Sequence, residues 1–222
     1  MASTFPGAID SFTDPLSGSA LNSPSHSAQH ADLNDAAEKI ETYMGLVKVI
    51  PTGATGGTVG ATGTVTVGSA QSAVTVSGCF TSLYNAYKII ISGGTASTGN
   101  VLNLQLVQSG GSVLTSGYYE VFIYSAYSGS TVLAANGNNI SFFQRVGGVI
   151  DTSGVYGSFE LINPFAATNT IYQNSPRADA AGGNAGNSTG QQSSLVSCTG
   201  FKLLVSAGTI SSSVISVYGY RI

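Results

Sequence analysis

Two histidines, His26 and His30, are the side chains with the clearest capacity for metal chemistry in this chain. A spacing of four residues places them on one face of a helix, where imidazoles from several helices can meet around a metal ion. The same spacing fits polar layers in a seam between packed helices, where hydrogen bonds fix the register. The seam is the simpler interpretation. We therefore expect no metal site and no other cofactor.

A pair of carboxylates is the other candidate for catalysis. Hydrolysis of a glycosidic bond needs two acidic groups about 5 to 10 Å apart, and Glu120 and Glu160 both fall in predicted strands. The few acids of the C-terminal region are more simply explained as solubility charges or as partners of basic residues. No Gly-x-Ser-x-Gly elbow occurs before a predicted helix, and the sequence has no phosphate-binding loop. We expect no enzyme, and a polysaccharide depolymerase is the least favoured function.

Tyrosine is the most notable side chain for binding, with 11 tyrosines, 9 phenylalanines and no tryptophan. A tyrosine combines a large contact area with a hydroxyl group at low entropic cost, which suits sugars and flat protein surfaces. Ordinary packing in strands explains at least half of them. We predict that a binding surface is formed by Tyr118, Tyr119, Tyr124 and Tyr127. We expect a polar loop over Asn174–Gln192 to contribute to the same surface.

The composition excludes several classes of partner. Charged residues make up only 8% of the chain and the net charge is -3, so the chain lacks the basic surface that nucleic acid requires. No apolar run approaches the roughly 20 residues of a membrane span. The N-terminus lacks the pattern of a signal peptide, and we expect synthesis in the cytoplasm. In that reducing compartment, Cys79 and Cys198 are expected to be free, buried thiols.

One stretch, Ser23–Gly45, has the pattern of an amphipathic helix. Ser23 and Pro24 suit the helix start, and Gly45 suits its end. Residues recur along it at spacings of 4, 3, 4, 3 and 4, the rhythm of a seam that packs against copies of itself or against a partner. The seam residues, which we predict to serve attachment or oligomerisation, are His26, His30, Leu33, Ala37, Ile40 and Met44.

The rest of the chain predicts a mainly β fold. Alternating strands separated by Gly/Ser/Asn turns are typical of a β-sandwich of the jelly-roll type. We expect an extended arm and the helix over residues 1–50, a Gly-rich linker over residues 51–63, and the sandwich over residues 64–222. Residues 87–95 and 201–209 match position by position, and an apolar strand follows each of them. We interpret these repeats as structurally equivalent hairpins.

The N-terminal segment resembles the attachment segments of tail-fibre and minor structural proteins of tailed bacteriophages. The resemblance rests on Ile9–Phe12, on the run from Ser23 to Ala36, on Ile40–Glu41 and on Gly45. It implies a virion component, commonly trimeric, whose β head points outward. Ala37 departs from a strong seam, because a bulkier apolar residue would pack better there. This departure favours a helix that docks on other virion proteins.

These observations predict a fibre or spike located in the virion. The N-terminal arm and helix are expected to bind other virion proteins, and the head is expected to bind the host surface through a glycan. The alternative is a capsid decoration or cement protein that binds only other virion proteins. Closed symmetry and the small size of the seam favour a homotrimer, in which three heads contribute most of the interface. We expect no partner among nucleic acids and no insertion into membranes.

Overall fold

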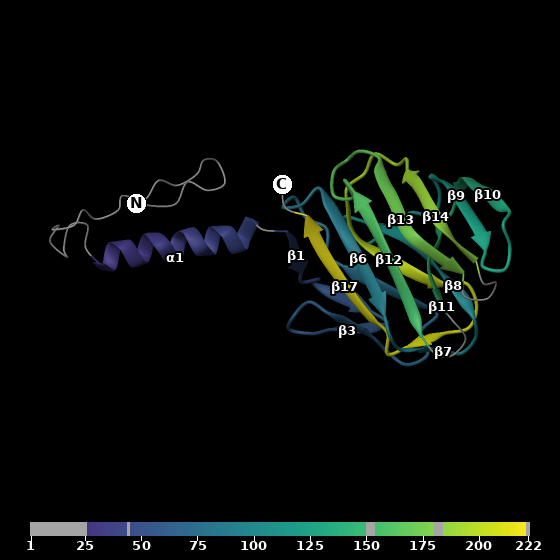
Figure 1. Cartoon of the computed structure of the whole chain (residues 1–222), viewed down its shortest axis with the longest axis horizontal. Coiled ribbons are helices and arrows are strands. Elements are labelled where there is room, and N and C mark those ends of the chain that lie inside the picture. Colours follow the sequence, from purple (N-terminus) through teal and green to yellow (C-terminus); the bar gives the residue numbers. More distant parts are fainter. Residues whose placement is uncertain (1–25, 44, 150–153, 180–183, 221–222) are drawn as a thin grey trace. The chain divides into compact units, whose positions relative to one another are not determined.

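The computed structural model describes residues 26–43, 45–149, 154–179 and 184–220, and its fold is mainly β with one helix near the N-terminus. The described residues fall into two compact units divided between Val47 and Lys48. We call residues 48–220 the head. Figure 1 shows the helix of the first unit and the strands of the head.

The helix α1 spans His26–Tyr43, close to the predicted bounds. Its predicted starting residues, Ser23 and Pro24, lie outside the described residues. Gly45 has a φ of 77°, the left-handed conformation that commonly ends a helix and that glycine adopts without strain. Gly45 therefore stops the helix before the first strand begins.

Seventeen strands follow the helix in the described residues. They are β1 (Leu46–Val49), β2 (Gly53–Thr55), β3 (Gly57–Val59), β4 (Val65–Val67), β5 (Ala73–Ser77), β6 (Ala86–Ser92), β7 (Thr95–Ala96), β8 (Asn100–Gln108) and β9 (Tyr118–Ala126). The others are β10 (Val132–Ile140), β11 (Phe143–Val149), β12 (Val155–Ile162), β13 (Thr170–Asp179), β14 (Asn184–Gln192), β15 (Cys198–Val205), β16 (Ile210–Ser211) and β17 (Val214–Tyr220).

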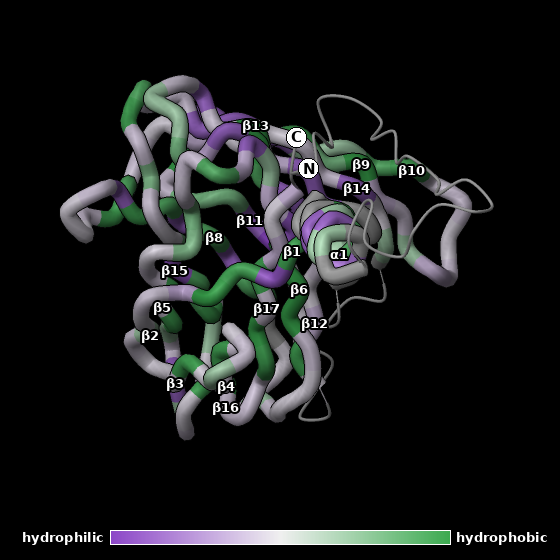
Figure 2. Tube along the Cα trace, turned by 90° about the vertical axis from the view of Figure 1, so that its left-hand side faces the viewer, coloured by the Kyte–Doolittle hydropathy of each residue, from purple (hydrophilic) through white to green (hydrophobic). Residues whose placement is uncertain are grey.

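Two layers of antiparallel strands form the head. One layer has the order β4-β17-β6-β12 and the other has the order β5-β15-β8-β11. When only these eight strands are numbered 1 to 8 along the chain, the two layers have the orders 1-8-3-6 and 2-7-4-5. This is the strand order of a jelly roll. In Figure 2, β5, β8 and β15 lie on one side of the head and β17, β6 and β12 on the other. The predicted jelly-roll sandwich is therefore confirmed.

The first layer continues beyond β12 through four more strands. The order β12-β13-β14-β9-β10 is held by antiparallel pairing at every step. β11 pairs with both β8 and β12, so hydrogen bonding joins the two layers along that side. We call β4-β17-β6-β12-β13-β14-β9-β10 the long layer and its surface that points away from the core the outer face.

The repeated segments occupy equivalent places in the two layers, although they do not form hairpins. The first repeat runs from β6 in the long layer to β8 in the other layer, and the second runs from β15 back to β17. β6 pairs with β17 and β8 pairs with β15, so each repeat lies beside the other. The short strands β7 and β16, which belong to the two crossovers, also pair.

The core lies between the layers and contains side chains from both. Ile89, Phe159 and Val217 project inward from the long layer, and Leu104 and Phe201 project inward from the opposite layer. A fully buried side chain of this kind contributes about 1.5 to 3 kcal/mol. Cys79 and Cys198 are free and buried, as predicted. Burial raises the pKa of the Cys198 thiol to about 11 and that of Cys79 further.

Two glycine-rich segments differ from their predictions. Residues 53–59, predicted as linker, form β2 and β3, which pair with β5 and β4. The predicted loop Asn174–Gln192 contains the end of β13 and all of β14. A side chain at Gly186 or Gly190 would collide with the backbone of β9, so glycine is required where β14 approaches it. Tertiary packing therefore makes strands from a composition typical of loops.

Candidate functional site

The side chains of the predicted α1 seam are exposed at every seam position where the structure describes them. The side chains of Leu33 and Ile40 are 60% and 43% exposed, and His30 and Ala37 are also exposed. The side chain of His26 and all of Met44 lie outside the described residues. The helix thus carries large apolar side chains that the described part of this chain does not bury.

Tyr118, predicted as a surface residue, belongs to the core, and this part of the prediction is wrong. Its side chain is fully buried, and its hydroxyl accepts a hydrogen bond from the backbone N–H of Leu106 and donates one to the carbonyl of Leu114. Burial raises its pKa well above the ordinary value, so the phenol stays protonated. The Tyr118 ring also meets Phe143 edge-on, with 4.9 Å between the ring centroids.

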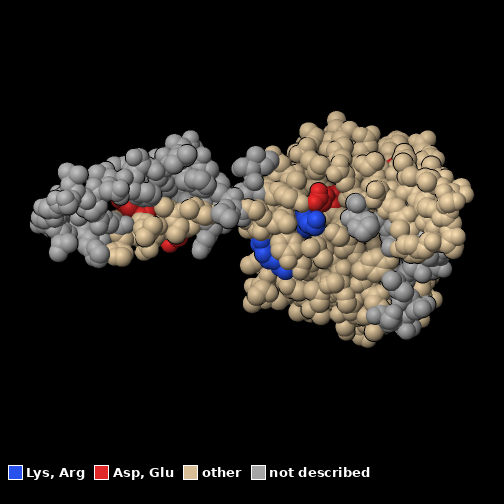
Figure 3. All heavy atoms as spheres, in the orientation of Figure 1, with Lys and Arg blue, Asp and Glu red and all other residues tan. Residues whose placement is uncertain are grey.

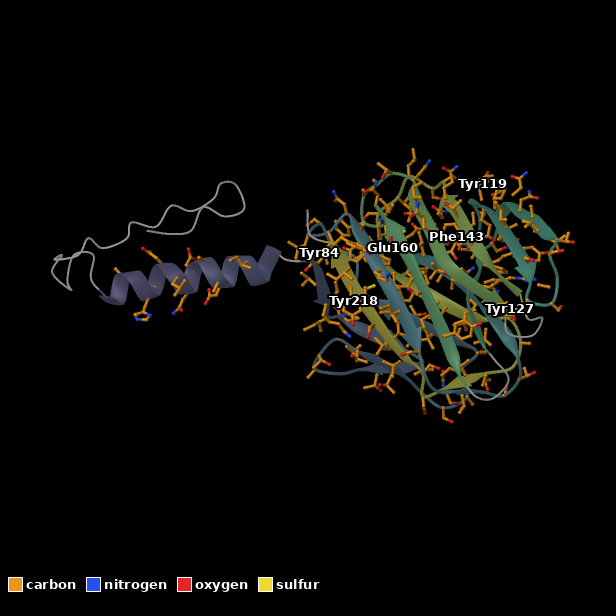
Figure 4. All side chains as sticks on the ribbon, in the orientation of Figure 1. Tyr84, Tyr119, Tyr127, Phe143, Glu160 and Tyr218 are labelled. Carbon is orange, nitrogen blue, oxygen red and sulfur yellow. The ribbon has the colours of Figure 1, made fainter. Side chains whose placement is uncertain are left out.

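The other predicted tyrosines are at least partly accessible. Tyr119 follows Tyr118 in β9 and therefore points to the outer face. Tyr124 is half-buried near the far end of the same strand, and Tyr127, just beyond it, is 72% exposed. Figure 4 labels Tyr119 and Tyr127 at opposite ends of the β9–β10 region. The structure therefore spreads these tyrosines along β9 instead of gathering them at one loop.

The strand register aligns side chains in a row across the outer face. Directly opposite residues in antiparallel strands share a face, so the pairings connect seven strands from β10 to β17. The row consists of Asn136, Val121, Thr189, Gln173, Glu160, Lys88 and Tyr218. At a strand spacing of about 4.8 Å it extends about 29 Å.

Two hollows lie side by side along β9 on this outer face, with volumes of about 470 and 420 Å³. Val121 and Thr189 line both hollows, so the hollows adjoin at the row described above. Tyr119, Asn136, Asn138, Ile171 and Gln191 line the first, and Ile123, Tyr124, Val132 and Asn187 line the second. We call the two hollows together the β9 groove. Its volume is in the range of pockets that bind small molecules.

Hydrogen bonds within the head orient two of the polar groups in the β9 groove. The hydroxyl of Thr189 donates to the backbone carbonyl of Tyr172 (3.1 Å), which leaves its oxygen as an acceptor toward the groove. The amide of Asn169 donates to Oε1 of Gln191 over 3.5 Å, which leaves the Gln191 amide nitrogen as a donor. The groove therefore offers both a hydrogen-bond acceptor and a donor beside its apolar side chains.

The core beneath the groove contains a line of packed aromatic rings. Phe143 stacks on Tyr172 with 4.5 Å between centroids, and Tyr172 packs against Phe159 at 6.1 Å. The Tyr172 hydroxyl is hydrogen-bonded to Ser188 of β14 (3.1 Å). Because these rings are buried and closely packed, they hold β13 and β14 in fixed positions. The strands that carry the groove side chains are thus supported from below.

Charged side chains on the outer face gather away from the groove. Lys88 and Glu160 form an ion pair (3.6 Å), and the hydroxyl of Tyr220 donates a hydrogen bond to Glu160. Partial burial, and then the adjacent carboxylate, raise the pKa of Tyr220 to about 12. Lys48 lies over the ring of Tyr218, 5.0 Å from its centroid. In Figure 3 the charged groups visible on the head lie mainly over β6, β12 and β17.

The two glutamates considered for catalysis do not share a face. Glu160 aligns with Val121 through the strand register and points outward. Glu120 precedes Val121 in β9 and therefore points to the opposite side, where it is only 3% exposed. Its carboxylate accepts hydrogen bonds from the backbone N–H of Gln144 (3.0 Å). These two groups therefore cannot act together on one glycosidic bond.

Among the described residues, no three His, Cys, Asp or Glu side chains gather in an arrangement suited to a metal ion. No described helix combines the length and the apolar character needed to cross a membrane. Comparisons of the chain with protein-family models, with curated proteins and with solved structures gave no match.

Sequence reasoning missed most of the groove residues. The sequence did not show that Val121 and Ile123 are exposed, because β9 has large side chains on both of its faces. One face carries Tyr118, Glu120 and Phe122, and the other carries Tyr119, Val121 and Ile123. A strand that is apolar on both faces signals either complete burial or an exposed apolar surface. Asn187, Thr189 and Gln191 were assigned to a loop, which gave no basis for placing them beside β9.

Proposed function

We propose that this chain is a structural protein of a bacteriophage virion, a fibre or spike. Its N-terminal segment attaches to other virion proteins, and its jelly-roll head binds a glycan on the host surface. The observation that carries the proposal is the exposed apolar seam of α1, on a unit separate from the head. A helix whose large apolar side chains stay exposed among the described residues is suited to docking.

The head supports the second part of the proposal. Jelly rolls occur in capsid proteins and in lectins, so this fold suits display and binding, although a fold alone does not assign a function. The outer face carries an accessible groove built on strands, which are rigid supports for binding residues.

A homotrimer is part of the proposal. Leu33 and Ile40 are the large apolar side chains in the described seam, and each contributes only about 1.5 to 3 kcal/mol when fully buried. One helix of this length is marginally stable in water by itself. Three copies that share the seam bury more of it than one copy does, and closed symmetry makes identical copies the simplest partners.

The test compares the full-length chain with a truncation that lacks residues 1–45. The truncation leaves every strand of the head intact, so its far-ultraviolet circular dichroism should remain that of a β protein. We expect this protein to be absent from purified particles, while the full-length chain is incorporated. Normal incorporation of the truncation would refute the attachment role of the N-terminal segment.

A label at the C-terminus then distinguishes the two kinds of virion protein. Gold particles bound to a C-terminal tag should appear at the end of the tail in electron micrographs. Label over the capsid shell would instead assign the chain as a decoration protein and remove the host-binding role.

A further inference from the structure

The side chains of the β9 groove are nearly all uncharged. Among the residues whose side chains are described, Glu120 is the one acidic or basic residue that lines either hollow, and its carboxylate is buried and bonded to the Gln144 backbone. The Lys88–Glu160 pair lies on β6 and β12, outside the lining of both hollows. A charged ligand would find no opposite charge among these described side chains, and it would lose its hydration without replacement. The groove is therefore suited to a neutral ligand.

Polar and apolar side chains are mixed in the β9 groove. Val121, which is 50% exposed, lies between Asn136 and Thr189 in the strand register. Ile123, which is 56% exposed, lies between Ala134 and Asn187. A lining that mixes polar with apolar side chains fits a ligand whose own surface combines hydroxyl groups with C–H faces.

The amides of the groove have unused hydrogen-bonding capacity. Within the described part of the chain, the side chains of Asn136, Asn138 and Asn187 make no hydrogen bond. Each amide offers two donors and an acceptor, so the three together provide for several hydroxyl groups. Thr189 and Gln191 add an oriented acceptor and an oriented donor.

We propose that the β9 groove binds an uncharged oligosaccharide. The two adjoining hollows act as neighbouring subsites, so the ligand contains at least two sugar units. The amides of Asn136 and Asn187 bind sugar hydroxyls in the first and second subsite, and Val121, which lines both hollows, packs against the C–H faces of the sugars. This inference rests on the proposed host-attachment function and names the ligand class of that same head.

The test uses the purified full-length protein on an array of immobilised oligosaccharides, both neutral and acidic, followed by titration with the best neutral one. We expect binding to neutral chains of two or more units and none to sialylated or uronate-containing chains. Replacement of one groove amide, Asn136→Ala or Asn187→Ala, should weaken binding about 3- to 10-fold, the usual effect of one neutral hydrogen bond. Val121→Asp should weaken binding at least as much.

The matched control is Gln173→Ala, an amide in the same row on β13 that lines neither hollow of the groove. It should bind like the unaltered protein. Binding only to acidic sugars, no binding to any neutral oligosaccharide, or equal loss in the control and the groove variants would each overturn the inference. Dissociation of an oligomer by Val121→Asp, measured by light scattering, would also overturn it by assigning the face to a second copy.

The two proposals fail separately. If the array shows no binding but the truncation still prevents incorporation, the virion role stands and the groove assignment falls. If the groove variants lose sugar binding but the truncation incorporates normally, the groove assignment stands and the attachment role falls.

Discussion

The replacement Tyr118→Phe tests the inward orientation of β9 most sharply. The variant retains the ring and its edge-on contact with Phe143, and it removes only the hydroxyl. That hydroxyl accepts from the Leu106 N–H at 2.8 Å and donates to the Leu114 carbonyl at 3.1 Å. The change therefore isolates two hydrogen bonds that join β8, the β8–β9 connection and β9.

The expected loss of stability follows from the burial of these hydrogen bonds. Tyr118 and Leu106 are fully buried, so water does not replace the lost partner of the Leu106 N–H. An unpaired buried donor costs about 1 to 3 kcal/mol. We expect the free energy of unfolding to fall by about 2 kcal/mol. With a urea m-value of about 2 kcal/mol/M, the unfolding midpoint should fall by about 1 M.

Urea unfolding followed by circular dichroism, at one fixed protein concentration, measures this shift. Tyr119→Phe is the matched control, because the neighbouring tyrosine points to the outer face and is half-exposed. Its unfolding free energy should change by less than about 0.5 kcal/mol. Equal midpoints for the two variants would refute the placement of Tyr118 in the core.

Four further predictions concern other regions. Folding raises the pKa of Tyr220 from 10.0 to about 12, so this residue should ionise late in an alkaline titration followed by phenolate absorbance. Its hydrogen bond to Glu160 should stabilise the fold fully below pH 10, and this stabilisation should be lost as the pH rises through 12. A Tyr220→Phe variant should lack that transition, and an unchanged titration curve would contradict the assignment. Cys79 and Cys198 should react with a thiol reagent only after denaturation, and rapid reaction in the native protein would disprove their burial. Light scattering should give three times the chain mass of 22.4 kDa, and a mass of one chain at all concentrations would exclude the trimer. Leu33→Glu should reduce incorporation into particles at least tenfold, whereas Ala31→Glu, which adds the same charge off the seam, should not.

Strands with a clear period of two could be predicted from the sequence. Val65 and Val67, and likewise Val74 and Val76, alternate with polar residues and are buried. A period of two fixes one face as the core whenever only that face is apolar. For the same reason the fold class was predictable, because many such strands separated by turns require a layered β structure.

The glycine-rich strand β14 was predicted as a loop for a physical reason. Gly186 and Gly190 reduce strand propensity locally, but their lack of a side chain is what allows β14 to lie against β9. Strand formation there depends on a neighbour more than 60 residues earlier in the chain, which local composition does not record.

The error at Tyr118 was avoidable in part. Consecutive residues of a strand point to opposite faces, so Tyr118 and Tyr119 cannot both lie on the surface. The sequence did not reveal which of the two was buried, because both faces of β9 carry large side chains. The strand register resolves this, since it aligns Val121 with Glu160 on the outer face.

We propose above that the N-terminal segment attaches the chain to the particle. The most direct measurement fuses residues 1–47 to an unrelated monomeric reporter protein and quantifies the fusion in purified particles by mass spectrometry. We predict that particles carry the reporter at a copy number close to that of the full-length chain, and that residues 48–222 alone are not incorporated. Particles that lack the reporter but contain the head alone would contradict the attachment role of the N-terminal segment.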